Sequence, residues 1–262
     1  WDYKHMLILC DLDGTLTPPR QSMSSEIANC IHRLTKLPKV EFGIITGSGK
    51  EYIDEQCKQY AYLAYGHGKT HCFPCNGTQH YIYGNNTMLY SHNMQEALAE
   101  NIYRLLIQTL LEEQIRFIKN TSYPQVTGTF IQYRTSLVNW CPIGRNASQK
   151  ARDNFVKFDQ QFGYRKYTLE RLKHIWNKFD IKVDCVLGGE TSFDIYPNGW
   201  DKSFVLSKLN SQDIIFIGDK CEGSGNDRAL YDKLPSDSRY SVSNPNETLL
   251  ILNKLYQDRL LD

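Results

Sequence analysis

Continuous apolar runs alternate with amphipathic segments in the first part of the chain and again in its last part. Residues 6–10 and 214–217 are uninterrupted apolar runs, which is typical of strands buried on both faces of a parallel sheet. Apolar positions at helical spacing over 24–34 predict a helix with Ser24 as its N-cap. A second strand is predicted at 40–46, with another helix after it. This order of strands and helices predicts an α/β sheet.

The middle of the chain has a different order, with one long amphipathic segment followed by separate strands and helices. It predicts a single helix over 92–114, paired strands at 129–134 and 137–141, helices at about 148–160 and 168–178, and strands at 182–187 and 192–196. The first pattern then returns, with a helix from Asp201, the strand at 214–217, a strand at 240–242 and a helix over 247–260. We therefore predict a doubly wound parallel-sheet core from residues 1–90 and 198–262, with an inserted α+β domain over 91–197.

Composition and charge exclude several classes of protein. The 262 residues are 41% hydrophobic and 23% charged, which is ordinary for a globular protein, and the formal net charge is +1. A balanced charge favours neither nucleic acid nor an anionic membrane as a partner. No apolar run approaches the roughly 20 residues that span a bilayer, and the first residues lack the order of a signal peptide. With eight cysteines that show no disulfide spacing, we expect a cytoplasmic protein with free thiols.

Polar residues that can carry chemistry follow the predicted strands. Asp11 and Asp13 come after the first strand, Ser48 after the second, and Asp219 and Asp227 after the strand at 214–217. Ligands of open parallel sheets bind beyond the carboxyl ends of the strands, so these side chains are expected to meet there. Two acidic residues one position apart point to opposite sides of an extended loop, and so one can attack a substrate while the other transfers protons.

A carboxylate nucleophile at this edge indicates phosphoryl transfer. It can accept a phosphoryl group as an aspartyl phosphate, and Mg²⁺ held by oxygen ligands would neutralise part of the phosphoryl charge. Ser48 and Lys202 could hold the remaining phosphoryl oxygens. Each residue alone also fits an ordinary role, because Asp-x-Asp-Gly-Thr can form a turn, Ser48 can cap a helix and Lys202 can be a solvated charge. Their placement after successive strands favours the functional interpretation.

Two levels of family resemblance are visible in these motifs. The segment Asp11-Leu-Asp-Gly-Thr15, with Ser48, Lys202 and Gly218-Asp219 in this order, resembles the four motifs of the haloacid dehalogenase superfamily. Four longer stretches are similar to the eukaryotic-type phosphomannomutase family: Gly128-Thr-Phe-Ile-Gln-Tyr-Arg134, Asn139-Trp-Cys-Pro-Ile-Gly-Arg145, Ser192-Phe-Asp-Ile-Tyr-Pro-Asn-Gly-Trp-Asp-Lys202 and Gly218-Asp-Lys-Cys-Glu-Gly-Ser-Gly-Asn-Asp227. The similarity runs from about residue 7 to residue 251, and it implies a haloacid dehalogenase-like core with a substrate-binding cap over 91–197.

The resemblance implies a role for each matching residue. Asp11 would be the phosphorylated nucleophile and Asp13 the proton donor and acceptor, with Ser48 and Lys202 completing the catalytic group. The substrate-binding residues would be Arg20, Arg134, Arg145, Arg152, Ser192 and Asp194. The Mg²⁺ ligands would be Asp11, Asp13, Asp219 and Asp227. The planar fork of arginine suits a phosphate, so a cluster of cap arginines is expected for an anionic sugar phosphate.

The implied activity is the interconversion of mannose 6-phosphate and mannose 1-phosphate, with a hexose 1,6-bisphosphate as activator, feeding GDP-mannose synthesis in a homodimer joined through the cap. The alternative is a haloacid dehalogenase-type sugar-phosphate phosphatase, which would need no arginines for a phosphate that is not reacting. A third interpretation is a non-catalytic binding protein. The presence of all the expected catalytic and metal-binding residues argues against it: Asp11, Asp13, Lys202 and Asp219. The preference for mannose over glucose stays open, because the two sugars differ at one hydroxyl.

The chain departs from the family pattern at four places. Cys75 and Gly49 replace residues expected in the core loops, and Lys233 stands where an acidic ligand of a second, structural cation is expected. The basic residues expected just before Gly128 are missing. These changes leave the nucleophile in place, but the contacts that hold the core loops around it are expected to differ from those of the family.

Overall fold

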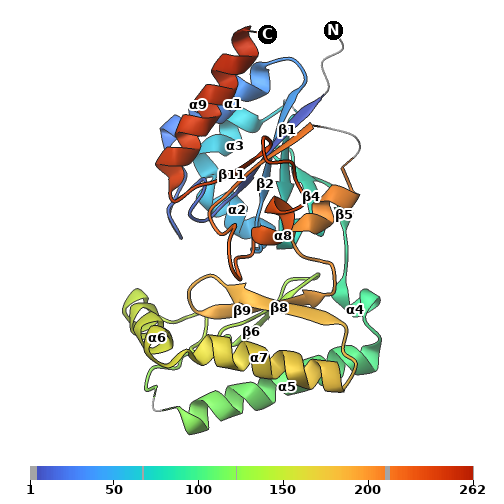
Figure 1. Cartoon of the computed structure of the whole chain (residues 1–262), viewed down its shortest axis with the longest axis vertical. Coiled ribbons are helices and arrows are strands. Elements are labelled where there is room, and N and C mark those ends of the chain that lie inside the picture. The colour runs from blue at the N-terminus through green and yellow to red at the C-terminus, as the bar shows by residue number, and fades with distance from the viewer. Residues whose placement is uncertain (1–4, 67, 122, 210–212, 262) are drawn as a thin grey trace. The chain divides into compact units, whose positions relative to one another are not determined.

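The computed structural model describes residues 5–66, 68–121, 123–209 and 213–261. Most of the first residues, for which no signal peptide is predicted, lie outside the described residues. The chain divides into two compact units (Figure 1). Trp1–Ser91 and Trp200–Asp262 form the core unit, and His92–Gly199 forms the insert unit. No helix among the described residues combines the length and the apolar character needed to cross a membrane.

Among the described residues, seven strands form the sheet of the core unit, in the order β11-β10-β1-β2-β3-β4-β5. The strands are β1 Met6–Asp11, β2 Val40–Ile45, β3 Thr70–Phe73, β4 Gln79–Ile82, β5 Thr87–Ser91, β10 Asp213–Gly218 and β11 Arg239–Ser241. The strands from β11 to β3 run parallel, as predicted, whereas β4 and β5 add an antiparallel edge that the pattern did not reveal. Asp11 and Gly218 therefore end neighbouring strands of one sheet.

Alternating residues of β1 enter two separate apolar clusters, one on each face of the sheet. Ile8 and Cys10 pack with apolar residues of α1 Ser25–Lys36, α2 Lys50–Gln56, α3 Lys58–Ala64 and α9 Pro245–Leu261. Leu7 and Leu9 pack on the other face with residues of the 3₁₀ helix η2 Lys202–Ser207 and of α8 Arg228–Tyr231. Burial of each large apolar side chain contributes about 1.5–3 kcal/mol, so coverage of both faces fixes the strand register. The Ser24 hydroxyl accepts the Ile27 amide, which confirms the predicted N-cap of α1.

The insert unit is a four-stranded antiparallel sheet with helices, in the strand order β6-β7-β9-β8 among the described residues. Its elements are α4 Met94–Ala97, α5 Glu100–Asn120, β6 Ile131–Tyr133, β7 Val138–Trp140, α6 Gln149–Phe162, α7 Tyr164–Lys178, β8 Val183–Gly188 and β9 Ser192–Pro197. The ring of Trp140 on β7 stacks on Phe193 of β9, and its indole nitrogen donates to the side chain of Gln114 on α5 at 2.8 Å. One face of this sheet therefore packs on α5, and the alternate residues face the other way.

Two predicted helices are wrong in detail. The single helix expected over 92–114 is two helices, because Leu98, which follows α4, adopts extended geometry with ψ 142°. The Leu98 side chain is buried. The helix expected from Asp201 is the 3₁₀ helix η2. Lys202 and Val205 are both buried, and three residues per turn place these two positions on the same side.

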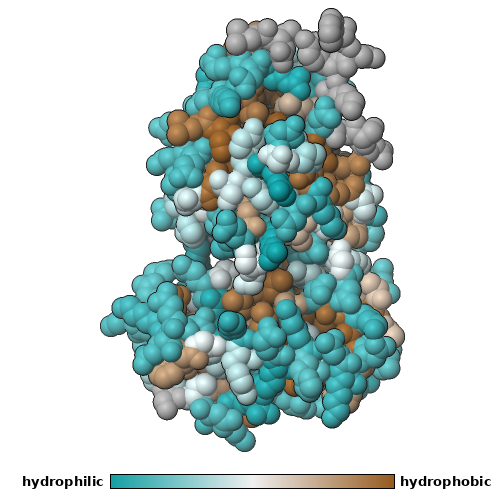
Figure 2. Space-filling view, viewed as in Figure 1, coloured by the Kyte–Doolittle hydropathy of each residue, from teal (hydrophilic) through white to brown (hydrophobic). Residues whose placement is uncertain are grey.

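Two other predicted elements differ at their ends. The strand expected over 129–134 is only Ile131–Tyr133, because Thr129 has a positive φ of 56°, which a strand does not tolerate. The helix α7 begins at Tyr164 rather than at 168, directly after Gly163, which ends α6 with a φ of 63°. Figure 2 shows that hydrophilic residues cover most of the viewed face of the molecule.

Candidate active site

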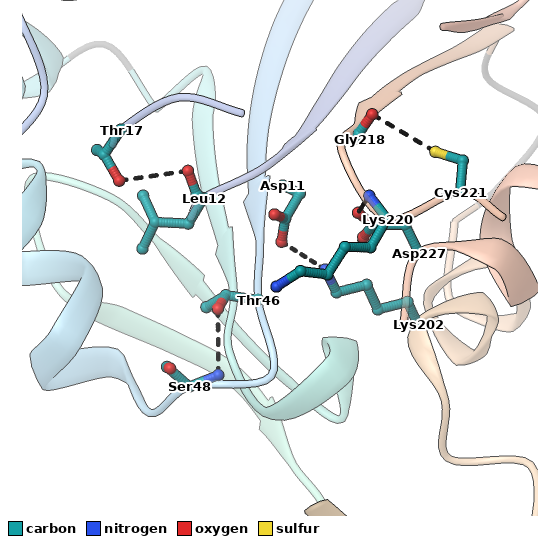
Figure 3. A network of polar contacts seen from close by, with 10 residues as sticks. All are labelled: Asp11, Leu12, Thr17, Thr46, Ser48, Lys202, Gly218, Lys220, Cys221 and Asp227. Carbon is teal, nitrogen blue, oxygen red and sulfur yellow. Dashed lines mark hydrogen bonds and ion pairs between the residues drawn. The ribbon is translucent and has the colours of Figure 1, made fainter. Parts of the chain in front are cut away.

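A buried lysine joins two carboxylates at the carboxyl end of β1. The Lys202 ammonium donates to Asp11, the last residue of β1, and to Asp227 Oδ1 at 2.5 Å (Figure 3). Lys202 is fully buried, as is Asp227, and Asp11 is only 5% exposed. An ionised lysine is rarely buried unless it is paired, so these two carboxylates account for its position.

The turn after β1 depends on Gly14. The Leu12 carbonyl accepts the amides of Leu16 and Thr17, each at 2.9 Å, which closes a tight loop directly behind Asp11. Gly14 has a φ of +85° and lies against the Asp219 carboxylate, where a Cβ atom would have no room. The glycine of the Asp-x-Asp-Gly-Thr motif thus lets the loops after β1 and β10 approach each other.

The loop after β10 is tied to Asp227 through its main chain. The Lys220 amide donates to Asp227 Oδ2 at 3.0 Å, and the Asp227 amide donates to the Lys220 carbonyl at 3.2 Å. Gly225 lies against that carbonyl, with no space for a side chain. Asp227 therefore orients Lys202 with one carboxylate oxygen and the loop with the other.

Burial and charge shift the proton affinities of this group. Burial raises the pKa of Asp11 well above its usual range, the Asp227 charge raises it further, and the Lys202 ammonium opposes both. Burial lowers the pKa of Lys202, but the charges of Asp11 and Asp227 outweigh it and the net shift is upward. Lys202 therefore stays protonated, and its ammonium is the charge that favours the carboxylate form of Asp11 against burial and the Asp227 charge.

Three carboxylates fit a divalent cation here. Oxygens of Asp11, Asp219 and Asp227 all lie within 4.8 Å of one another. Asp219 Oδ1 is buried and has no hydrogen-bond partner among the described residues, which is costly unless a ligand satisfies it. Hard oxygen donors suit Mg²⁺. The residues present therefore fit a metal cofactor.

Asp13 lies outside this carboxylate group. Its Oδ1 accepts the Tyr52 hydroxyl at 2.7 Å and the Arg20 amide at 3.1 Å. Arg20 itself is exposed and has a positive φ of 61°, so the loop bends sharply to bring its amide to Asp13. The two aspartates of the motif thus have different partners, as their spacing predicts. Metal binding by Asp13 stays a prediction.

Ser48 is half-buried in the loop after β2. Its amide donates to Thr46 Oγ1 at 3.1 Å, and its carbonyl accepts the Cys75 amide at 2.9 Å (Figure 3 shows Thr46 and Ser48). Cys75 belongs to the short 3₁₀ helix η1 Cys75–Gly77. The contact uses the Cys75 main chain, so the unusual cysteine does not remove the support of this loop.

One face of the insert sheet carries a cluster of polar side chains. Gln132 on β6 pairs with Asn139 on β7, which pairs with Asp194 on β9, so the three share one face. The Gln132 side chain accepts from Arg134 Nε at 3.2 Å and from Nη2 at 3.1 Å. Asn139 Oδ1 accepts from Arg145 at 2.7 Å, and its amide donates to Asp194 Oδ1 at 2.7 Å.

This cluster is electrically positive. Burial lowers the pKa of Arg145 to about 10, with the neighbouring Arg134 as the next cause and Arg152 contributing in the same direction. The three guanidinium groups therefore repel one another, and an anion among them would relieve that repulsion. The structure brings together the insert residues singled out from the sequence.

Arg152 and Ser192 are bound to the main chain around the cluster. Arg152 is buried and donates to the carbonyl of Arg145 at 2.8 Å, to that of Ala147 at 3.3 Å and to the Thr191 hydroxyl at 2.8 Å. The Ser192 hydroxyl donates to the Gly188 carbonyl at 2.7 Å and accepts the Asn139 amide at 3.0 Å. These contacts hold the Arg145 loop, and substrate binding by Arg152 stays a prediction.

Sequence reasoning missed two residues that organise these groups. Tyr52, on α2, faces Asp13, and nothing in the local sequence signals that contact. Asn139 joins Arg145, Asp194 and Ser192. Its position next to Trp140 on a short strand places it on the polar side of the sheet, which is the signal that could have identified it.

A family model and curated relatives match most of this chain. The family model described as eukaryotic phosphomannomutase matches residues 27–258. The chain is 33% identical to a phosphomannomutase of Babesia bovis over 231 residues, covering 86% of this chain and 87% of that protein. It is 31% identical to a phosphomannomutase of Arabidopsis thaliana over 252 residues, covering 96% of each.

Solved structures support the fold alone. The IMP-nucleotidase of Plasmodium falciparum aligns with a TM-score of 0.61 at 17% identity, over 96% of this chain and 68% of that one. A trehalose-6-phosphate phosphatase related protein aligns with a TM-score of 0.55 at 15% identity, over 97% of this chain and 99% of that one. Both are similar to this chain in the arrangement of helices and strands.

Proposed function

The chain belongs to the eukaryotic phosphomannomutase family, and from this premise we propose how its residues move a phosphoryl group between the two ends of a sugar. The activity is that of a phosphomannomutase, which interconverts mannose 6-phosphate and mannose 1-phosphate. The observation that carries the mechanism is the buried contact of Asp11 with Lys202 at the carboxyl end of β1. A carboxylate oxygen at this sheet edge, paired with an ammonium, can attack phosphorus.

Asp11 is the proposed nucleophile. Its carboxylate oxygen forms a bond to phosphorus of a hexose 1,6-bisphosphate while the bond from phosphorus to the sugar oxygen breaks. Asp13 gives the leaving sugar oxygen a proton. In the second half, the free hydroxyl of a hexose monophosphate forms a bond to phosphorus, the bond from phosphorus to the Asp11 oxygen breaks, and Asp13 takes the hydroxyl proton. The bisphosphate formed in this way then turns and returns its other phosphoryl group to Asp11. The hydrogen bonds from Tyr52 and from the Arg20 amide hold Asp13 for both transfers.

Asp11, Asp219 and Asp227 are the residues proposed to hold Mg²⁺, with the main chain of Asp13 as a further ligand. A bound Mg²⁺ would neutralise charge on the phosphoryl oxygens. Lys202 keeps Asp11 and Asp227 in place, and Ser48 is proposed to hydrogen-bond a phosphoryl oxygen. The orphaned, buried Asp219 Oδ1 supports this assignment.

The insert unit is proposed to bind the hexose phosphate on the polar face of its sheet. Arg134 and Arg145 supply charge for a phosphate, and Ser192 and Asp194 supply hydrogen bonds for sugar hydroxyls. Arg20, on the core unit, is proposed as a further substrate-binding residue. A phosphatase that acts on one phosphate does not require this second cationic cluster, which favours the mutase over the phosphatase alternative.

An assay with mannose 1-phosphate, hexose 1,6-bisphosphate and Mg²⁺ tests the proposal. We expect mannose 6-phosphate to form in amounts equal to the substrate lost, with little inorganic phosphate. Omission of the bisphosphate should slow the reaction strongly, because it provides the phosphoryl group that loads Asp11. Release of one phosphate for each sugar phosphate consumed would instead identify a phosphatase. Parallel reactions with glucose 1-phosphate measure the sugar preference.

We also propose that the enzyme works in the cytoplasm. All eight cysteines are free, which suits the reducing cytoplasm, where mannose 1-phosphate would feed GDP-mannose synthesis.

A homodimer through the insert unit is supported by Leu111, Ile115 and Ile118, apolar residues of α5 that are each about half exposed. Sedimentation tests it, and a 30.4 kDa species at micromolar concentration would contradict it.

A further inference from the structure

The candidate active site contains a second lysine, Lys220, that the roles above do not use. It directly follows Asp219 in the loop after β10, and its side chain is exposed. In Figure 3 the Lys220 side chain extends past the Lys202 ammonium toward the side of the site where Thr46 and Ser48 lie. Within the part of the chain that the structure describes, no carboxylate forms an ion pair with it.

The two lysines differ in what neutralises them. Lys202 is enclosed by Asp11 and Asp227, so its charge is already balanced by the protein. Lys220 approaches the group from the solvent side, with an exposed side chain whose ammonium keeps its donors available.

The main chain fixes where this side chain starts. The reciprocal hydrogen bonds with Asp227 hold the Lys220 amide and carbonyl, and Gly225 closes the space behind the carbonyl. A flexible surface lysine would lack such an anchor. Because the backbone is held on both sides, the Lys220 side chain leaves the loop in a direction set by the same aspartate that orients Lys202.

The charge of the incoming group explains why a second cation is needed. Asp11, Asp219 and Asp227 place three carboxylates where a phosphoryl group must approach, and the buried Lys202 ammonium together with a bound Mg²⁺ would only balance their charge, leaving the charge of the phosphate itself without a partner. A phosphate monoester carries nearly two negative charges at neutral pH, and like charges oppose its entry. A free ammonium at the solvent edge would attract it and hold one of its oxygens.

We propose that Lys220 is a phosphate-binding residue of the core unit, donating to an oxygen of the phosphoryl group that reacts at Asp11. The proposal rests on the function proposed above and adds a substrate contact to it. Lys202 then orients the nucleophile, while Lys220 binds the group to be transferred. Because its contact is with the phosphate and not with the sugar, Lys220 contributes equally to mannose and glucose phosphates.

Calorimetry on the Mg²⁺-saturated enzyme tests the proposal, with inorganic phosphate as the probe. For Lys220→Met we expect phosphate affinity to fall roughly 10- to 100-fold, as for loss of a hydrogen bond to a charged group. Lys220→Arg should stay within a few-fold of wild type. Lys254→Met, which removes an exposed charge from α9, is the matched control and should bind phosphate as wild type does.

A Mg²⁺ titration separates phosphate binding from mere support of the loop. Removal of the Lys220 charge should leave Mg²⁺ affinity unchanged or higher, because the carboxylates lose a neighbouring cation. If Mg²⁺ and phosphate affinities fall together, Lys220 is structural and the proposal is wrong. It is also wrong if Lys220→Met binds phosphate within about twofold of Lys254→Met, less than one charged hydrogen bond provides. Failure of the wild type to convert mannose 1-phosphate would contradict the proposed function and not these binding results.

Discussion

Replacement of Lys202 by methionine tests the buried ion group that organises the active site. Methionine fills a similar volume but leaves Asp11 and Asp227 buried without their counter-ion. Removal of one partner from a buried ion pair costs about 3–5 kcal/mol. For a protein of this size that corresponds to a fall in Tm of roughly 6–20 °C. Activity should be lost as well, because Asp11 would then be protonated more often.

The loss of stability in Lys202→Met should depend on pH. Burial and the Asp227 charge already raise the pKa of Asp11, and without Lys202 nothing as close opposes them. A carboxyl group with a raised pKa binds more protons in the folded state than in the unfolded state. Its contribution is present below the unfolded pKa of about 3.9 and is lost as the pH rises through the folded pKa. The variant should therefore be less destabilised at about pH 5 than at about pH 8.

Thermal unfolding followed by circular dichroism, in the presence of a metal chelator, measures both effects. Lys254→Met serves as the control, because an exposed substitution is expected to change the unfolding free energy by less than about 0.5 kcal/mol. If Lys202→Met unfolds at the same temperature as Lys254→Met at both pH values, the buried ion group does not stabilise the site and the reasoning is wrong.

Three further substitutions address other parts of the account. Tyr52→Phe removes a hydrogen bond to Asp13 and should lower kcat roughly tenfold with little change in KM, whereas an unchanged kcat would show that this contact does not position Asp13. Asn139→Ala separates Arg145 from Asp194, so steady-state kinetics should show KM for mannose 1-phosphate raised by about fivefold or more and kcat changed less. Asp219→Asn should abolish the rise in Tm that Mg²⁺ produces, and an undiminished rise would place the metal elsewhere.

The core of the fold could be predicted because its strands are buried on both faces. Residues 6–10 must be apolar throughout for that reason, and the run ends where Asp11 begins the polar loop. The antiparallel edge was harder to recognise, since β5 is largely exposed and lacks an apolar pattern. The helical spacing of apolar residues also continues across Leu98, a buried residue at which the backbone is extended and α4 has ended, so the spacing alone did not reveal the break.

The residues of the candidate site could be predicted from the sequence, but their burial and their contacts with one another could not. Motif spacing brings Asp11, Asp219 and Asp227 together, because the loops after neighbouring parallel strands lie at one edge of the sheet. That Lys202 is buried while Lys220 is exposed depends on a 3₁₀ turn and on Gly225, neither of which sequence spacing reveals. Contacts formed across elements, such as Tyr52 with Asp13, arise only from packing.

Acid quenching of the working enzyme, followed by mass analysis of its peptides, tests the central claim most directly. With hexose 1,6-bisphosphate and Mg²⁺ present, the peptide that contains Asp11 should carry the mass of one phosphoryl group, and the same peptide from Asp11→Asn should not. A wild-type enzyme that converts mannose 1-phosphate while this peptide stays unmodified, or while the phosphoryl group resides on another residue, would contradict the account.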